Sequence, residues 1–172
     1  ETGLTEVFDS GDMMEQKQAV VAGKLCEGCK TGSTNVNGDK CDDVCPFNSD
    51  EAPPKFDDRS DAKGPEPECV TTGVTSDGRR LAFIGLERVG GVMVYDITDP
   101  LNPVYVRYLQ NRDFDGVAVD GTAGDLGPEG LVFVGAEESA DGHAYIVTSN
   151  EVSGTITAHR LVEAAEVVEG CT

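Results

Sequence analysis

Two glutamates in this chain each follow a proline at the start of a run of β-forming residues. Glu68 ends the segment Gly64-Pro-Glu-Pro-Glu, and Glu129 ends the segment Gly127-Pro-Glu. A rigid turn that presents a carboxylate at the start of a strand offers the oxygen ligand that Ca²⁺ prefers. A single acidic residue in a turn can instead accept hydrogen bonds from backbone N–H groups. The duplication of Glu68 and Glu129 favours a shared role in binding a cation.

Further acidic and amide side chains lie in the segments around these turns. Asn and Asp alternate around a glycine in the segment 35–43, as the oxygen ligands of calcium loops do. This segment resembles a thrombospondin type 3 calcium repeat, although it has a single copy and has Asn where that repeat has Asp. An Asx-rich turn without a cation is the alternative. Outside the two glutamates, the candidate cation ligands are Asp113, Asp115, Asp125, Asn35, Asn37, Asp39, Asp42 and Asp43.

Three arginines lie beside the candidate acids in sequence and are candidate anion contacts. Arg59, Arg88 and Arg112 could neutralise a phosphate or form salt bridges with the neighbouring carboxylates. His143 and His159 fall in no metal-binding or nucleophile motif, and we expect both to be structural. The sequence therefore assigns no catalytic residue.

The chain has six cysteines, of which four lie close together. Cys26, Cys29, Cys41 and Cys45 have the spacing C-x2-C-x11-C-x3-C, which could hold zinc. The surroundings are acidic and rich in Asn and Gly, and Cys69 and Cys171 make an even number of cysteines. We therefore favour three disulfides in an oxidising compartment over zinc. Pairing within the first four and a Cys69–Cys171 bond is one plausible set, but six cysteines allow fifteen pairings.

Two similar patterns of strands and turns lie about sixty residues apart. Gly91 aligns with Gly154, 63 positions later, and the Pro-Glu pairs that start at 67 and 128 lie 61 positions apart. Each pattern contains an Asp-Gly hairpin signal, at 77–78 and 141–142. A repeat of roughly forty to sixty residues made of short strands is typical of propeller blades. A β-sandwich with two similar hairpins is the alternative.

The sequence thus predicts an all-β fold: a partial β-propeller of about two blades plus a strand of a third, with a disulfide-rich, loop-rich insertion. Each blade should end in an outer strand, the first at 103–109, and a helix is possible at 12–22. Two blades do not close a ring, so we expect the remaining blades elsewhere in the same chain or in a separate one. The predicted divisions are an outer strand of a preceding blade (1–12), a cysteine-rich acidic insertion loop (13–62), a blade (63–110), an acidic connecting loop (111–127), and a blade with a C-terminal tail (128–172).

The composition is strongly acidic. The 32 Asp and Glu residues outnumber the 13 Lys and Arg residues, which gives a net charge of −19. This charge argues against nucleic-acid binding, which needs a basic surface, and favours a cation-rich setting such as calcium or high salt. The sequence contains no transmembrane run and no signal peptide, so a secreted form is expected to have lost its leader.

Several long motifs resemble the choice-of-anchor I family. They are 63–68, Phe83–Ile97, 111–114, 124–130 and 150–154, and the resemblance covers residues 57–161 and 7–11. It implies an extracellular or cell-surface, seven-bladed β-propeller of which this chain is the C-terminal part. The family includes proteins linked to biomineralisation, and some members are described as phosphatase-like or phytase-like. Cys69 stands where the family usually has glycine, and the segment Cys26–Cys45 is an insertion.

These observations predict a secreted, calcium-associated propeller segment that acts as a binding or scaffold module in a matrix, surface layer or filament. Possible partners are matrix components or further copies of the chain, which could add strands at open blade edges. The alternative is part of a phytase-like or alkaline-phosphatase-like phosphoesterase, in which carboxylates hold calcium that polarises a phosphoryl group. Whether the chain is an enzyme stays open, and activity of this chain alone is the less favoured outcome.

Overall fold

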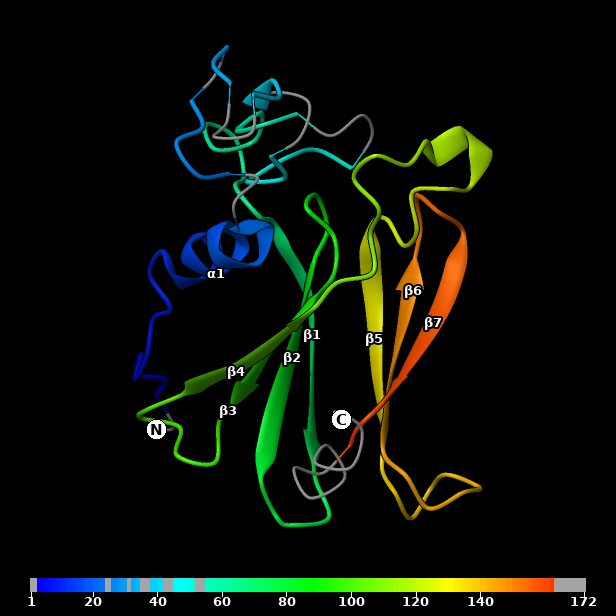
Figure 1. Ribbon diagram of the computed structural model, residues 1–172. Helices are drawn as coiled ribbons and strands as arrows, with labels where there is room; N and C mark the ends of the chain where they lie inside the picture. The colour runs from blue at the N-terminus through cyan, green and yellow to red at the C-terminus, as the bar shows by residue number, and fades with distance from the viewer. Residues whose placement is uncertain are drawn as a thin grey trace, which may run out of the picture.

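Two antiparallel β-sheets form the framework of the structure (Figure 1). The computed structural model describes residues 3–23, 26–30, 32–34, 38–41, 45–51 and 55–162 of the 172-residue chain. The elements are α1 (Met13–Ala22), β1 (Pro67–Val74), β2 (Arg80–Leu86), β3 (Val92–Asp96), β4 (Val104–Leu109), the 3-10 helix η2 (Ala118–Asp120), β5 (Pro128–Val134), β6 (Tyr145–Asn150) and β7 (Thr155–Arg160). The all-β class predicted from the sequence is confirmed.

Each sheet is a meander in which consecutive strands are neighbours. The first sheet has the order β1-β2-β3-β4 and the second has the order β5-β6-β7. The predicted Asp-Gly turns join β1 to β2 and β5 to β6, and the glycines Gly78 and Gly142 have φ values of 86° and 74°. A side chain disfavours this left-handed conformation, which explains the glycines. The predicted outer strand of the first sheet is β4.

The two sheets share one irregularity in the same place. In the first sheet Pro67 pairs with Leu86, and the register shifts between Pro67 and Cys69. In the second sheet Pro128 pairs with Asn150, and the register shifts between Pro128 and Gly130. The shift leaves Glu68 and Glu129 outside the ladder at equivalent positions. Such bulges commonly change the direction of one side chain.

This pairing corrects the alignment expected from the sequence. Leu86 pairs with Gly91 at the start of the β2–β3 turn, and Asn150 pairs with Thr155 at the start of the β6–β7 turn. Leu86 and Asn150, 64 positions apart, are therefore the equivalent residues, whereas the sequence suggested a spacing of 63. The sequence suggested matching Gly91 to Gly154, but the pairing makes Gly90 the equivalent of Gly154, since the N–H groups of Gly90 and Gly154 donate to the carbonyls of Leu86 and Asn150.

The two sheets pack against each other through apolar side chains. Leu81, Phe83, Val92, Val94 and Ile146 form one buried cluster. The rings of Phe83 and Phe133 lie 5.8 Å apart between centroids. Gly73 allows this approach, since an added Cβ would lie 2.3 Å from the Phe133 ring. The two sheets contact each other through faces that are not equivalent. Ile146 of the second sheet is equivalent to Ala82 of the first. Ala82 precedes Phe83 in β2, so the two side chains point to opposite faces of the sheet.

Helix α1 packs against part of the other face of the first sheet (Figure 1). Leu86, Val89, Met93, Tyr95 and Tyr108 form a second buried cluster there, and Met13 and Met14 of α1 pack against it. The helix that the sequence allowed at 12–22 is thus present and contributes to the packing of this face.

The outer strand expected within residues 1–12, whose apolar residues lie in Leu4–Phe8, does not form in the described part of that segment. Residues 3–10 belong to no strand, and residues 3–9 are exposed. A strand needs a partner for its backbone N–H and C=O groups, and no described strand lies beside this segment in the pairing of the two sheets.

Candidate functional site: a glutamate cluster at one end of the two sheets

Five glutamates gather where β1 and β5 begin and β2 and β6 end. The carboxylate oxygens of Glu66, Glu68 and Glu87 lie within 4.8 Å of one another, and so do those of Glu87, Glu129 and Glu151. Glu87 belongs to both groups, so the five side chains form one cluster, which we call the glutamate cluster. Glu66 and Glu87 are buried, whereas the other three are exposed.

The two sheets supply equivalent pairs of these residues. Glu68 and Glu129 are the residues left outside the β-ladders. Glu87 and Glu151 are the first residues after β2 and β6, one position beyond the equivalent Leu86 and Asn150.

Equivalent backbone hydrogen bonds hold the two turns in place. The Glu87 N–H donates to the Glu66 carbonyl at 2.9 Å, and the Glu151 N–H donates to the Gly127 carbonyl at 2.8 Å. Glu66 and Gly127 also share a positive φ, 51° and 69°. The repeat therefore places one pair of carboxylates per sheet beside the other pair, and Glu66 adds a fifth.

The carboxylates at the centre of the cluster repel one another. Burial raises the pKa of Glu87; the charge of Glu66 raises it further, Arg88 lowers it, and Glu68 raises it. Burial also raises the pKa of Cys69, and Glu68 and Glu129 add to this effect. Carboxylates in such an arrangement either bind a cation or take up a proton.

Arg88 neutralises one side of the cluster. Its Nε lies 2.7 Å from Glu66 Oε2, its Nη1 lies 2.6 Å from Glu51 Oε1, and its Nη2 lies 3.1 Å from Glu87 Oε1. Burial works against ionisation of Glu66, but hydrogen bonds from Lys63 and Arg88 lower its pKa. Glu68, Glu129 and Glu151 form no ion pair with a described residue. The negative charge left over is therefore on the exposed side.

Arg112 ties the segment 45–51 to the first sheet. Its side chain is buried, and its guanidinium donates to the carbonyls of Arg88, Val89, Asp50 and Glu51 at 2.8 to 3.1 Å. Burial lowers its pKa to about 10. Arg112 therefore holds the backbone beside the glutamate cluster and is not exposed to an external anion. Arg59 is the third predicted anion contact, and its Nη1 lies 3.9 Å from Asp50 Oδ2.

The other predicted cation ligands that the structure describes lie outside the glutamate cluster. Asp125 accepts hydrogen bonds from Asn111 and Thr155, both at 2.6 Å, and from Thr157. Burial opposes its ionisation, but these hydrogen bonds hold its pKa below the ordinary value. Asp113 accepts from the Asp115 N–H at 3.0 Å, as a turn residue does. Asp39 is exposed, and Asn35, Asn37, Asp42 and Asp43 lie outside the described residues.

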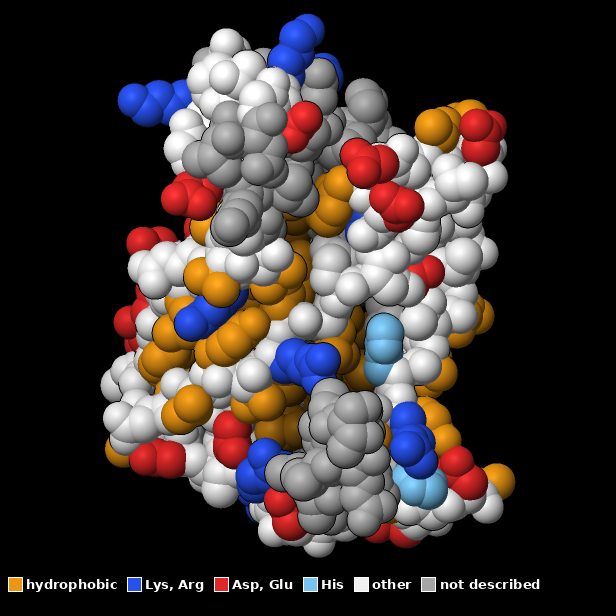
Figure 2. Space-filling view, in the orientation of Figure 1, with side chains coloured by type: hydrophobic (Ala, Val, Ile, Leu, Met, Phe, Trp, Pro, Cys, Tyr) orange, Lys and Arg blue, Asp and Glu red, His pale blue; other side chains and the backbone are white. Residues whose placement is uncertain are grey.

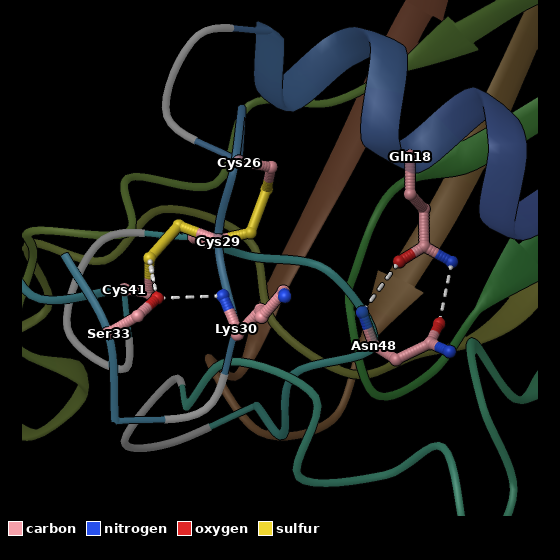
Figure 3. Close-up of a disulfide and its surroundings, with 8 residues drawn as sticks. Gln18, Cys26, Cys29, Lys30, Ser33, Cys41 and Asn48 are labelled. Atoms are coloured by element: carbon pink, nitrogen blue, oxygen red, sulfur yellow. Dashed lines mark hydrogen bonds between the residues drawn. A yellow bond between two sulfur atoms is a disulfide. The ribbon is translucent and has the colours of Figure 1, made fainter. Parts of the chain in front are cut away.

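Two disulfides brace the segment next to the cluster. Cys26 bonds to Cys45, and Cys29 bonds to Cys41. Figure 3 shows these bonds beside α1, whose Gln18 exchanges two hydrogen bonds with Asn48 at 3.1 and 3.2 Å. Cys69 has no disulfide with a described residue. The predicted partner Cys171 lies outside the described residues.

Sequence reasoning identified Glu68 and Glu129 but missed Glu66, Glu87 and Glu151. A usable signal was present, because Glu87 and Glu151 each follow an apolar strand and lie 64 positions apart. The expected spacing of 63 instead matched Glu87 to Asn150. Only the strand pairing brings the glutamates into alignment.

These features define a disulfide-braced all-β protein with an acidic site between two related sheets. The sequence matches the choice-of-anchor I domain over residues 1–100, and the chain belongs to this family. Membership and the disulfides point to a surface or secreted protein. No curated protein and no solved structure matches the chain. Among the described residues, no helix has the length and apolar character needed to span a membrane.

Proposed function

We propose that this chain is a calcium-binding segment of an extracellular β-propeller that serves as a binding or scaffold module in a matrix, surface layer or filament. The observation that carries the proposal is the glutamate cluster, in which the repeat brings Glu68 and Glu87 beside Glu129 and Glu151. Ca²⁺ takes six to eight oxygen ligands, and five carboxylates offer enough of them.

Calcium suits this site better than a softer metal. All five side chains supply carboxylate oxygens, the ligands that hard cations prefer. Three of them are exposed, so an ion could enter from solvent and keep some of its water. Because Glu87 belongs to both groups, an ion in either group would contact it. Glu87 is therefore the residue on which the proposed site depends.

The packing of the two sheets supports a propeller in preference to a sandwich. Blades that follow one another around an axis pack through different faces, and the Phe83 face of the first sheet packs against the Ile146 face of the second. The face of the second sheet that is equivalent to the Phe83 face lies opposite Ile146. It carries Val132 and Ile156, which are 59% and 77% exposed. We propose a further blade of the same or another chain as the partner of this face.

The scaffold role is preferred to the phosphoesterase because of the arginines. Phosphoryl transfer needs cationic side chains that meet the phosphate. Arg88 is bound by carboxylates, and Arg112 is bound by four carbonyl groups. An acidic cluster whose neighbouring arginine side chains are already bound by protein groups is suited to holding calcium as a structural link between sheets or molecules.

Calorimetric titration of metal-free protein with Ca²⁺ tests this function. The wild-type chain and Glu137→Gln, an exposed residue outside the cluster, should bind calcium with the same affinity. Glu87→Gln and Glu129→Gln should each weaken binding at least about tenfold, which corresponds to a loss of about 1.4 kcal/mol. Equal affinity in wild type and Glu87→Gln would reject the glutamate cluster as the site.

A further inference from the structure

A second site lies at the opposite end of the two sheets from the glutamate cluster. A cleft of about 510 Å³ opens between them, and its buried wall includes Leu81, Phe83, Val94 and Ile146. Glu68 is the second residue of β1, at the acidic end, and Thr75, which lines the cleft, follows the last residue of β1. At about 3.3 Å per residue, the two ends are roughly 20 Å apart. The cleft volume is within the range of pockets for small organic ligands.

Basic side chains surround this apolar wall. Arg79 lies before β2, Arg107 lies on β4, and Arg160 ends β7, and all three line the cleft together with His143 and His159. Figure 2 shows several basic and histidine side chains in the lower half of the view, some of them beside apolar surface. Three of the 13 Lys and Arg residues of a chain with net charge −19 thus meet at one cleft.

Two of these arginines are available to a ligand. The Nε of Arg79 lies 2.8 Å from Asp77 Oδ2, and His143 Nδ1 lies 3.5 Å from Asp141 Oδ2, so these two residues face acidic partners. Arg107 and Arg160 are exposed and form no ion pair with any described residue. Charge of one sign along the walls of a cleft concentrates ions of the opposite sign there.

We propose that this cleft binds an organic monocarboxylate with an aliphatic body, such as a medium-chain fatty acid. The guanidinium groups of Arg107 and Arg160 would receive the carboxylate, because the planar fork of arginine matches both carboxylate oxygens. The wall around Phe83 and Ile146 would take the hydrocarbon and remove it from water. The proposal uses neither the glutamate cluster nor calcium, so it stands or falls independently of the proposed function.

Binding of decanoate to the whole chain, followed by calorimetry and by NMR shifts of residues lining the cleft, tests the proposal. Decanol shares the hydrocarbon and acetate shares the charge, so both should bind at least tenfold more weakly than decanoate. The double variant Arg107→Glu/Arg160→Glu should also lose at least about tenfold in affinity, because it removes the charge-assisted hydrogen bonds to the carboxylate. Lys55→Glu, an exposed control outside the cleft, should bind decanoate as wild type does.

Three results would overturn the proposal. They are the absence of saturable binding of decanoate, equal affinity for decanol, and unchanged affinity in the double arginine variant. Both arginines are exposed, so the variant is expected to fold. Circular dichroism and the thermal midpoint should match those of Lys55→Glu, which separates loss of the site from loss of the fold.

Discussion

Replacing Glu87 by glutamine removes the one negative charge that both groups of the glutamate cluster share. The side chain is buried, and the amide has nearly the same shape as the carboxylate. The amide oxygen can still accept from Arg88, whose Nη2 lies 3.1 Å from Glu87 Oε1. The substitution therefore changes mainly the electrostatic repulsion with the other glutamates.

The size of that repulsion follows from the geometry. Carboxylate oxygens in each group lie within 4.8 Å of one another. At that distance two like charges repel by about 1 kcal/mol in water and about 3 kcal/mol at an effective dielectric constant near 20. The Arg88 contact offsets part of this. We expect Glu87→Gln to raise the unfolding free energy of the calcium-free protein on the order of 1–2 kcal/mol at neutral pH.

The gain in unfolding free energy from Glu87→Gln should increase with pH. The pKa of Glu87 is raised above its ordinary value of 4.5, so the folded protein binds this proton more tightly than the unfolded chain does. Stability contributed by the neutral carboxyl is complete below pH 4.5 and is lost as pH rises through the folded-state pKa. The advantage of Glu87→Gln should therefore be absent at low pH and grow toward neutral pH.

Urea unfolding with a calcium chelator, at pH 4 and at pH 7.5, measures this difference. Added calcium should then reverse the order of stabilities, because wild type gains about 2.7 kcal/mol at a calcium concentration of 100 Kd. Glu87→Gln should gain much less. Lower stability of the variant at neutral pH without calcium would show that Glu87 does not destabilise the calcium-free protein, and an equal gain with calcium would show that Glu87 does not bind the ion. Glu137→Gln, which is exposed, serves as the control and should change neither value.

Three further substitutions test other parts of the structure. Arg112→Met should lower the unfolding free energy by about 3 kcal/mol, because four carbonyls lose a charged donor; hydrogen exchange should show faster opening of residues 45–51. Gly73→Ala should destabilise the fold by about 1–3 kcal/mol in urea unfolding, since its Cβ would meet the Phe133 ring. The double variant Cys29→Ala/Cys41→Ala should cost about 3 kcal/mol by thermal unfolding, the value for closing a loop of this length; an unchanged midpoint would show that this bond does not stabilise the native state.

Local signals predicted the strands and their turns. The Asp-Gly pairs at 77–78 and 141–142 and the apolar runs that flank them determine the two hairpins. The same local pattern failed at Leu4–Phe8, where apolar residues have no described neighbouring strand. The spacing of the repeat was wrong by one residue because equivalence depends on hydrogen bonding across the turn at Gly90 and Gly91.

The candidate site was predictable only in part, because long-range packing assembles it. The repeated Pro-Glu pairs identified Glu68 and Glu129. Glu66, by contrast, depends on the turn that it forms with the Glu87 N–H. The role of Arg112 depends on a loop about sixty residues away in sequence, whose carbonyls it binds. Neither contact can be predicted from the spacing of residues in the sequence.

A crystal structure of the chain grown with calcium, with anomalous diffraction to locate the ion, would show whether the glutamate cluster binds calcium. We expect a cation about 2.3–2.6 Å from oxygens of Glu87 that is also bound by glutamates of both sheets. Glu68 and Glu129 free of any ion at millimolar calcium, with Glu87 bound by Arg88 alone, would contradict it.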